Sequence, residues 1–538
     1  MRQPQIAAFL LGAAAAVAQS PPGFDEALAR YQTVMQRKPF AHHLEGREKL
    51  AGTKAAAAWP LLAKDYEKPP DYLEYSRYTL AALIGRHFDR AEFVEPMVQL
   101  REQCTKGVDA WLWFHSLRIQ ADRGSAAAVE QIAIEGKSVM QRAAAILALG
   151  SARQANLAPA VLANVLNFPK KESERMLLLG AMTGAFWESR LRVNETSYRE
   201  ALKAYISLLE PDVKLSHTAC VQIGRHLHKI LGGPAMFVNP EPWLALLDRG
   251  EVKKPTSQQT SAQPRFFGIE TDGERLIYLL DMSDSMCKKI EPSAKPSGPI
   301  TGPKQKKPRA LLDESDLPWH KIATRWDLAR EQLKISLLRL TPEKYFSVVW
   351  FGTDSGTLES TKGMVKATKT NVDRAVAELD AIKPGDPDAN KAPDGQLRGR
   401  TNLHSGLTKA FGLAGKGFVE QVAYVDADAI TEGCDTIFLL SDGAPSWDDF
   451  HCLDKDYGEG EVVLDTEYGK KMPRTPTLEY HGPYVHDDWL VEDLRRMNSF
   501  RRIRLHCIGL GEANMALLKR LAEIGHGETF LVGEKKGK

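Results

Sequence analysis

The stretch RLIYLLDMSDSMCKKI, residues 275–290, decides the fold of the carboxyl-terminal half of this chain. Its apolar run, Leu276–Leu280, ends at Asp281, and hydroxyls follow at Ser283 and Ser285. A short continuous apolar run with polar residues at its end is typical of a buried strand. The stretch therefore predicts a strand that delivers a carboxylate and two hydroxyls together at its end.

The same pattern returns along the rest of this half, where strands alternate with helices. Further strands are predicted at Tyr345–Trp350, Thr436–Leu440, Ile503–Ile508 and Thr529–Val532. Helical periodicity lies between them, for example in RWDLAREQLKISLLRL and NMALLKRLAEIG. Such alternation predicts an α/β fold, a doubly wound and mostly parallel sheet with helices on both faces.

The amino-terminal half has a different pattern, which is helical and rich in Ala and Leu. Successive helical stretches separated by short breaks predict an all-α, HEAT-like helical repeat domain over residues 19–250, although a degenerate repeat leaves an irregular bundle open. The polar segment that follows predicts a linker over residues 251–270. The α/β domain is then expected over residues 271–538.

Oxygen-bearing side chains occur where three segments of the α/β domain leave their strands or enter a helix. They are Asp281, Ser283 and Ser285 after the first strand, Thr401 at a predicted helix start, and Asp442 after a later strand. Parallel sheets collect functional groups at the carboxyl ends of their strands. We therefore expect these segments to meet.

These residues resemble the metal-ion-dependent adhesion site of the von Willebrand factor type A (VWA) domain family. That site has the form DxSxS, then a Thr, then an Asp, which match Asp281, Ser283, Ser285, Thr401 and Asp442. The resemblance covers roughly residues 271–532, and the closing segment IRLHCIGLGEANMALLKRLAEIGHGETFLV is similar to the last strand–helix–strand unit of the family. It implies a divalent cation, Mg²⁺ before Ca²⁺ or Mn²⁺, that binds an Asp or Glu of a protein partner.

Simpler interpretations exist for each residue alone. Ser283 and Ser285 could cap a helix, Thr401 could be the N-cap of a helix that starts at Asn402, and Asp442 could open a turn. Together they would leave two carboxylates converging without a counter-charge, which is costly unless a cation or a proton is present.

Asp284 departs from the family pattern, where many members have glycine. An added carboxylate beside the ion would weaken binding of an acidic ligand or favour calcium or manganese, unless the side chain points outward. Insertions near residues 288–320 and 446–490 would flank the same face and are candidate specificity loops.

The amino terminus predicts export. Arg2, an apolar run and small residues at Ala16–Ala18 form a signal peptide over residues 1–18, so a secreted or periplasmic location is expected. No later segment is apolar enough to cross a membrane. A net charge of +2 gives no support to a nucleic-acid partner. Six cysteines make neither a disulfide scaffold nor a CxxC pair, and a bridge between Cys434 and Cys452 stays open.

Motifs of catalysis are missing from the sequence: no G-x-S-x-G, H-E-x-x-H, Walker A or G-x-G-x-x-G after a strand occurs. His404 lies near Thr401, but a capping or surface histidine is favoured over a role at the metal face. We therefore expect a non-enzymatic, metal-dependent protein-binding protein of adhesion type. The alternatives are a module in which the metal only stabilises the fold and an accessory subunit of an enzyme complex.

Overall fold

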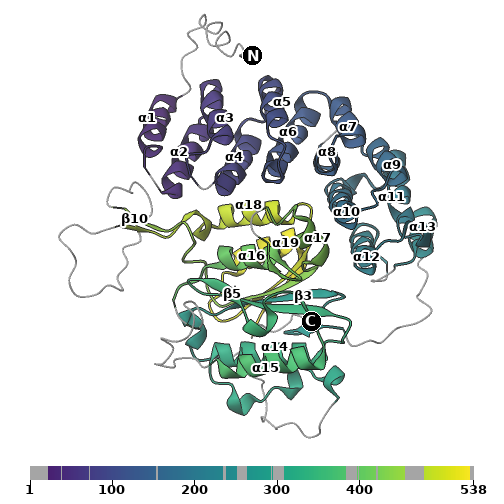
Figure 1. The fold of residues 1–538 in the computed structure, drawn as a ribbon, viewed down its shortest axis with the longest axis vertical. Coiled ribbons are helices and arrows are strands. Elements are labelled where there is room, and N and C mark those ends of the chain that lie inside the picture. Colours follow the sequence, from purple (N-terminus) through teal and green to yellow (C-terminus); the bar gives the residue numbers. More distant parts are fainter. Residues whose placement is uncertain are drawn as a thin grey trace, which may run out of the picture.

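The computed structural model of the protein describes residues 22–37, 39–71, 73–152, 156–233, 238–250, 263–291, 294, 308–382, 397, 399–419, 422–454 and 478–532. An array of helices comes first along the chain and an α/β domain follows (Figure 1). The expected signal peptide, residues 1–18, and residues 251–262 of the expected linker lie outside the described residues. Within the part that is described, no helix is both long and apolar enough for a membrane span.

A seven-stranded sheet forms the centre of the α/β domain, in the order β13-β12-β9-β3-β4-β5, with β6 also paired to β4. The strands β13, β12, β9, β3 and β4 are parallel, whereas β5 and β6 run antiparallel to β4. The mostly parallel sheet predicted from the sequence is therefore confirmed. Its strands are β3 (Arg275–Asp281), β4 (Tyr345–Phe351), β5 (Ser355–Thr357), β6 (Val365–Lys366), β9 (Thr436–Ser441), β12 (Arg504–Gly509) and β13 (His526–Leu531).

Both faces of the sheet are covered by helices, which explains why β3 is a continuous apolar run. Tyr278 and Leu280 belong to one core cluster with Trp326 of α14, while Ile277 and Leu279 belong to another with helices α16, α18 and α19. Full burial contributes roughly 1.5–3 kcal/mol for each large apolar side chain. The helices of the domain are α14 (Arg325–Arg339), α15 (Lys369–Ala381), α16 (Leu403–Gly412), α17 (Ala427–Glu432), α18 (Asp487–Asn498) and α19 (Met515–Ile524).

Three small hairpins complete the domain, and they differ from the sequence expectation. They pair β1 (Arg265–Phe266) with β2 (Ile269–Glu270), β7 (Leu413–Ala414) with β8 (Gly417–Phe418), and β10 (Cys452–Asp454) with β11 (Leu478–Tyr480). The first lies within the range expected to be linker. Phe266 is buried there, and its ring lies 5.4 Å from that of Tyr278, because an aromatic pair in a polar segment can still reach the core.

Helices of the amino-terminal part stack in two layers, consistent with a helical repeat. The even-numbered helices from α2 to α12 pack successively, and α7, α9, α11 and α13 pack successively beside them. The bounds are α1 (Phe24–Val34), α2 (Phe40–Gly52), α3 (Trp59–Glu67), α4 (Leu73–His87), α5 (Val94–Gln103), α6 (Ala110–Arg123), α7 (Ala126–Glu135), α8 (Val139–Ser151), α9 (Ala158–Leu166), α10 (Glu172–Glu188), α11 (Thr196–Ser207), α12 (His217–Leu231) and α13 (Pro240–Arg249).

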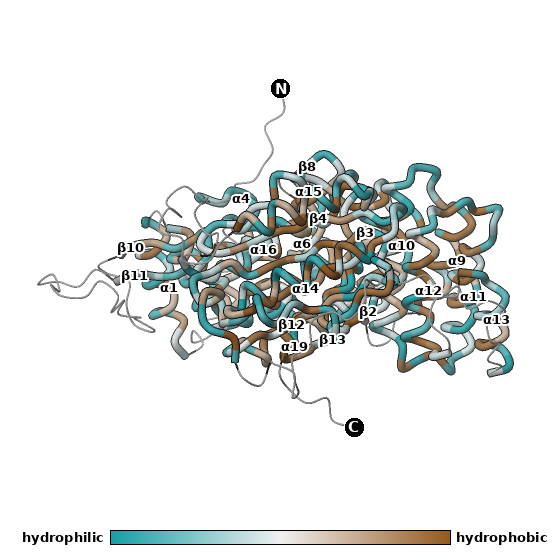
Figure 2. Tube along the Cα trace, turned by 90° about the horizontal axis from the view of Figure 1, so that it is seen from below, coloured by the Kyte–Doolittle hydropathy of each residue, from teal (hydrophilic) through white to brown (hydrophobic). Residues whose placement is uncertain are grey.

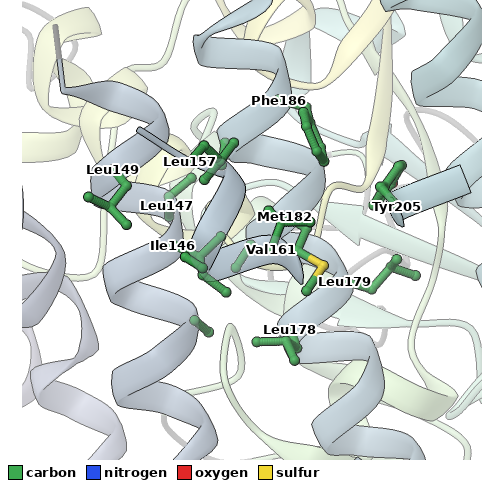
Figure 3. Packing of buried hydrophobic residues seen from close by; sticks show 14 of the residues in the cluster. Ile146, Leu147, Leu149, Leu157, Val161, Leu178, Leu179, Met182, Phe186 and Tyr205 are labelled. Carbon is green, nitrogen blue, oxygen red and sulfur yellow. The ribbon is translucent and has the colours of Figure 1, made fainter. Parts of the chain in front are cut away.

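A continuous apolar cluster between these layers stabilises the array. Ile146 and Leu149 of α8 lie in it with Leu178 and Met182 of α10 and with Val161 of α9 (Figure 3). All are between 0% and 1% exposed. Hydrophobic segments run through the middle of the molecule and hydrophilic turns lie around its edge (Figure 2).

The array arches over the α/β domain and packs against it (Figure 1). Helix α4 contacts α18, and α10 contacts α17. Gly180 of α10 permits a close approach, since a Cβ there would collide with the carbonyl oxygen of Phe500. The segment after β9 docks at the other end of the arch, where the Phe450 ring lies 4.8 Å from that of Phe40 and 4.7 Å from that of Tyr75.

Substitution of Phe450 by Ala tests how far this docking contributes to stability. Phe450 is 7% exposed, and truncating a buried phenylalanine costs about 3–5 kcal/mol in transfer and cavity terms. We expect Phe450→Ala to lower the free energy of unfolding by about 3 kcal/mol in denaturant titrations. Phe418→Ala is the control, because Phe418 is 38% exposed and should change stability by less than about 0.5 kcal/mol. Equal effects would contradict a docked Phe450.

Candidate metal centre

The candidate centre lies where two adjacent parallel strands end. β3 and β9 are paired in parallel, with Leu280 opposite Leu440. Asp281 is the last residue of β3, Ser441 is the last residue of β9, and Asp442 follows it. Parallel neighbours end at the same edge of a sheet, so two carboxylates from distant parts of the chain arrive side by side.

Four of the five expected side chains form one chain of hydrogen bonds. The Ser283 hydroxyl donates to Asp281 Oδ1 over 2.6 Å, and the Ser283 and Ser285 Oγ atoms lie 2.9 Å apart. The Ser285 hydroxyl donates to Asp442 Oδ1 over 2.6 Å. Asp281, Ser283 and Asp442 are each 0–1% exposed, whereas Ser285 is half-buried. Ser285 therefore marks the side of the group that is nearest solvent.

The contacts of these residues differ from the capping and turn roles that the sequence also allowed. The Ser283 side chain makes no capping hydrogen bond to the short 3-10 turn that follows it. The N-cap of α16 is Asn402, whose Oδ1 accepts from the Ser405 N–H over 3.0 Å, so Thr401 lies one residue before the cap. Asp442 contacts Ser285 rather than its own turn.

Thr401 is brought to the same edge through its backbone. Its N–H donates to the Ser446 hydroxyl over 3.0 Å, and its carbonyl accepts from the Ser446 N–H over 3.0 Å. Thr401 is 6% exposed. The structure thus ties Thr401 to the segment that follows Asp442, and it does not bring the Thr401 hydroxyl into the hydrogen-bonded chain of the other four.

Asp284 points outward. This decides whether its carboxylate lies beside the proposed ion, which the sequence left open. Its side chain is exposed, and its Oδ1 accepts from the Gly399 N–H over 2.7 Å. The Asp284 N–H donates in return to the Gly399 carbonyl over 3.2 Å. The Asp284 carboxylate therefore fixes the loop before Thr401 and adds no ligand beside Asp281.

One of the two carboxylates has a counter-charge from the protein itself, which the expectation from the sequence did not include. Arg325, 3% exposed at the start of α14, donates from Nη1 to Asp442 Oδ2 over 2.8 Å. Its Nε donates to Glu291 Oε1 over 2.9 Å. The sequence RWDLAREQ does not by itself predict the contact between Arg325 and Asp442, because the two residues lie 117 positions apart in the chain.

Asp281 accepts only from serine groups, and no basic side chain among the described residues pairs with it. Burial, and then the negative charge of Asp442, raise the pKa of Asp281 to about 7. The Ser441 hydroxyl donates to Asp281 Oδ2 over 2.9 Å, and the Ser283 N–H donates to Oδ1 over 3.0 Å. A cation bound beside both carboxylates would relieve the repulsion between them.

The donor set fits a hard divalent cation. Carboxylate and hydroxyl oxygens are the ligands that Mg²⁺ and Ca²⁺ prefer, and Mg²⁺ keeps several waters. The set contains only two carboxylates, and no group of three or more His, Cys, Asp or Glu side chains that could hold a metal occurs among the described residues. Hydroxyls would therefore have to supply the remaining protein ligands.

His404 does not belong to this group and is not the capping or surface residue that the sequence favours. It is 1% exposed, its Nε2 lies 3.0 Å from Asp493 Oδ2, and its ring stacks on Tyr484 at 3.7 Å. The helical array covers it, which local sequence does not reveal. Cys434 is a buried thiol and forms no disulfide with Cys452.

Comparison with known proteins identifies the fold family. Residues 311–453 and 484–529 match the family model described as von Willebrand factor type A domain. The matched ranges contain Thr401 and Asp442 and begin after the DxSxS segment. No curated protein matches the chain.

Solved structures resemble parts of the chain at low identity. Von Willebrand factor type A from Catenulispora acidiphila has 14% identity and a TM-score of 0.27, over 51% of this chain and 47% of that chain. The PilB minor pilin from Streptococcus sanguinis has 16% identity and a TM-score of 0.26, over 50% of this chain and 59% of that chain. The chain thus spans less than two thirds of each structure.

A double-mutant cycle on Arg325 and Asp442 tests the buried ion pair. We expect Arg325→Gln to lower the free energy of unfolding by about 3 kcal/mol, because removing one partner leaves a buried charge uncompensated. Arg325→Gln combined with Asp442→Asn should lose less than the sum of the single losses, measured in denaturant without metal. Arg374→Gln on exposed α15 is the control. If the losses of the two single variants simply add in the double variant, the interaction between Arg325 and Asp442 would be contradicted.

Proposed function

The chain contains a von Willebrand factor type A domain behind an array of helices, and from this premise we propose that it is an exported, non-enzymatic protein-binding protein. The presence of a VWA domain supports a role as a protein-interaction or adhesion-type module. In the proposal, a divalent cation, Mg²⁺ before Ca²⁺ or Mn²⁺, is held by Asp281, Ser283, Ser285, Thr401 and Asp442. The partner is a protein that presents an Asp or Glu side chain.

The observation that carries the proposal is the convergence of Asp281, Ser283, Ser285 and Asp442 at the carboxyl edge of the sheet. Two buried carboxylates meet there, and the hydroxyls between them add oxygen donors without formal charge. Asp284, turned toward Gly399, adds no further negative charge to the group. A centre with so few anionic ligands leaves a bound cation electrophilic.

The residues around the centre fix its ligands before a partner arrives. Ser441 and the Ser283 N–H hold Asp281, and Arg325 holds Asp442. When bound, the cation would supply a Lewis-acid position for a carboxylate of the partner. Rigid first ligands reduce the reorganisation that such capture requires.

Positive charge beside the centre also suits an acidic partner. Arg400 directly precedes Thr401, and its guanidinium carbon lies 4.6 Å from the centre of the Trp447 ring. The half-buried Ser285 and the exposed Ala444 lie at the start of the segments that border the site. The exposed start of the insertion near Ala444 would therefore border a partner that reaches the cation, as expected for a specificity loop.

Export is supported by the sequence alone, through the signal-peptide pattern of residues 1–18. A secreted or periplasmic location follows from it. The array of helices would act as a spacer or as a second docking surface for the partner. A pulse-chase of the full chain that recovers protein lacking residues 1–18 outside the cytoplasm tests this part.

One observation favours a second candidate, a VWA module whose metal only stabilises the fold. Asp281, Ser283 and Asp442 are almost fully buried, and Arg325 already compensates one of the two charges. Such a centre could hold an ion that no partner reaches. A role as accessory subunit of an enzyme complex is the third candidate, and turnover lost in Ser283→Ala would contradict the non-enzymatic assignment.

Magnesium titration of matched variants tests the proposal. We expect Mg²⁺ to raise the melting temperature of the wild type, and calorimetry to show one site. Asp442→Asn should lower Mg²⁺ affinity at least about tenfold, because it removes an anionic ligand. Asp284→Asn, the control, should change it by less than about threefold, because the Asp284 carboxylate points away from Asp281 and the Asn side-chain oxygen can still accept from the Gly399 N–H.

Partner capture separates the two candidates. Proteins from the native source that the wild type and Asp284→Asn retain only with Mg²⁺, and that Asp442→Asn does not retain, would support the adhesion-type function. Mg²⁺ that raises the melting temperature while capture stays the same with and without chelator would support the structural module instead.

A further inference from the structure

A partly open cavity of about 180 Å³ lies between the array of helices and the α/β domain, away from the candidate metal centre. Four arginines line it: Arg225 of α12, Arg275 at the start of β3, and Arg501 and Arg502 between α18 and β12. Only two carboxylates, those of Glu172 and Asp435, are among the lining residues that the structure describes. Positive charge therefore exceeds negative charge by two.

Two of these guanidinium groups have hydrogen-bonding capacity that the protein leaves unused. Arg225 is 7% exposed and Arg501 is 8% exposed. Their Nη2 atoms are buried and have no hydrogen-bond partner among the described residues. An unsatisfied buried donor costs about 1–3 kcal/mol, and more when it is charged. A rotation of either guanidinium toward the cavity would bring these donors to a ligand that accepts hydrogen bonds.

The other contacts of these groups do not neutralise the cavity. Arg501 donates from Nη1 to the carbonyl oxygens of Phe411 and Ala423, over 2.9 and 3.1 Å. Arg502 donates from Nε to the Gly180 carbonyl over 3.3 Å. Both sets of acceptors are uncharged. Burial lowers the pKa of the Arg502 guanidinium to about 10.

The carboxylates in the lining are already engaged. Asp435 Oδ2 accepts from the backbone N–H groups of Glu274 and Arg275, over 2.9 and 3.0 Å. Its Oδ1 accepts from the Thr436 hydroxyl over 2.8 Å and lies 3.7 Å from Arg225 Nη1. Arg225 itself pairs at 2.6 Å with Asp272, which does not line the cavity.

The first turn of α12 also borders the cavity, and it already contacts one carboxylate, because the Thr218 hydroxyl donates to Glu274 over 2.7 Å. Ser216, its N-cap, and Thr218 both line the cavity, and the helix runs for 15 residues from His217 to Leu231. A helix N-terminus carries a partial positive charge that favours anions. Gln222, one turn further along, also lines the cavity and is 8% exposed.

We propose that this cavity binds a phosphate group, which bridges Arg225 of the helical array to Arg501 and Arg275 of the α/β domain. A water molecule needs only about 10–15 Å³ of such space, so a polyatomic anion has room. A phosphate group carries about −1.5 to −2 charge at pH 7 and accepts forked guanidinium hydrogen bonds. Its charge is opposite to that of the arginines in the lining.

Binding would act on the contact between the two parts of the molecule. Arg225 comes from the helical array, whereas Arg275, Arg501 and Arg502 come from the α/β domain. Arg225 already pairs with Asp272 of the α/β domain over 2.6 Å, so one ionic contact holds this interface. Phosphate held between Arg225 and the arginines of the α/β domain adds a further ionic contact and stabilises the docked arrangement, at a site separate from the cation centre.

Titration of the full chain with inorganic phosphate tests the proposal, against chloride at matched ionic strength. We expect a saturable rise in melting temperature and a single calorimetric site in metal-free buffer. Gln222→Glu places a carboxylate in the cavity with almost no change in shape. It should raise the melting temperature without phosphate and weaken phosphate binding at least about tenfold, since like charges repel at short range.

Two controls make the test specific. Gln222→Met keeps the position neutral, and Arg123→Gln removes an exposed arginine from α6, so both should bind phosphate within threefold of the wild type. A phosphomonoester that binds more tightly than inorganic phosphate would support the site as a receptor for a larger phosphorylated ligand. A response equal to that of chloride, or unchanged in Gln222→Glu, would overturn the proposal.

Discussion

The parallel pairing of β3 with β9 is the constraint on which the rest of the site depends. It places Leu280 opposite Leu440, so the next residues, Asp281 and Ser441, end at the same edge. Neither strand can slip by one residue without exchanging its two buried faces. The convergence of the carboxylates is thus fixed by the hydrophobic burial of both strands, and Arg325 compensates the charge of Asp442.

The local sequence pattern was sufficient to predict the helices and strands that depend mainly on local interactions. The apolar run before Asp281 specified β3, and the capping box of Thr324 and Asp327 accompanies the predicted helix α14. Pairing order then follows from the rules of parallel sheets, which is why Asp281 and Asp442 could be expected to meet. Helix α18 was not predicted, because it follows an insertion without regular pattern.

The missing part of the prediction concerns contacts between distant segments. The ion pair of Arg325 with Asp442 depends on how α14 packs beneath the sheet edge, and the burial of His404 depends on the array that covers it. Neither has a periodicity or a spacing that marks it in the sequence. The partners of these buried charges therefore could not be predicted from the sequence pattern, because tertiary packing determines which charged groups meet.

The segment after Asp442 links the candidate centre mechanically to the helical array. Ser446 pairs with the Thr401 backbone, and four residues later Phe450 lies in the core of the array. Between them, Asp448 is buried and accepts from the N–H groups of Phe450 and Tyr484, each over 2.7 Å. A shift of this segment at the centre would have to break those bonds or move the docked aromatic ring. The array therefore restrains the geometry of the Thr401–Asp442 side of the centre, and a ligand that strengthens docking elsewhere along the arch stabilises the same arrangement.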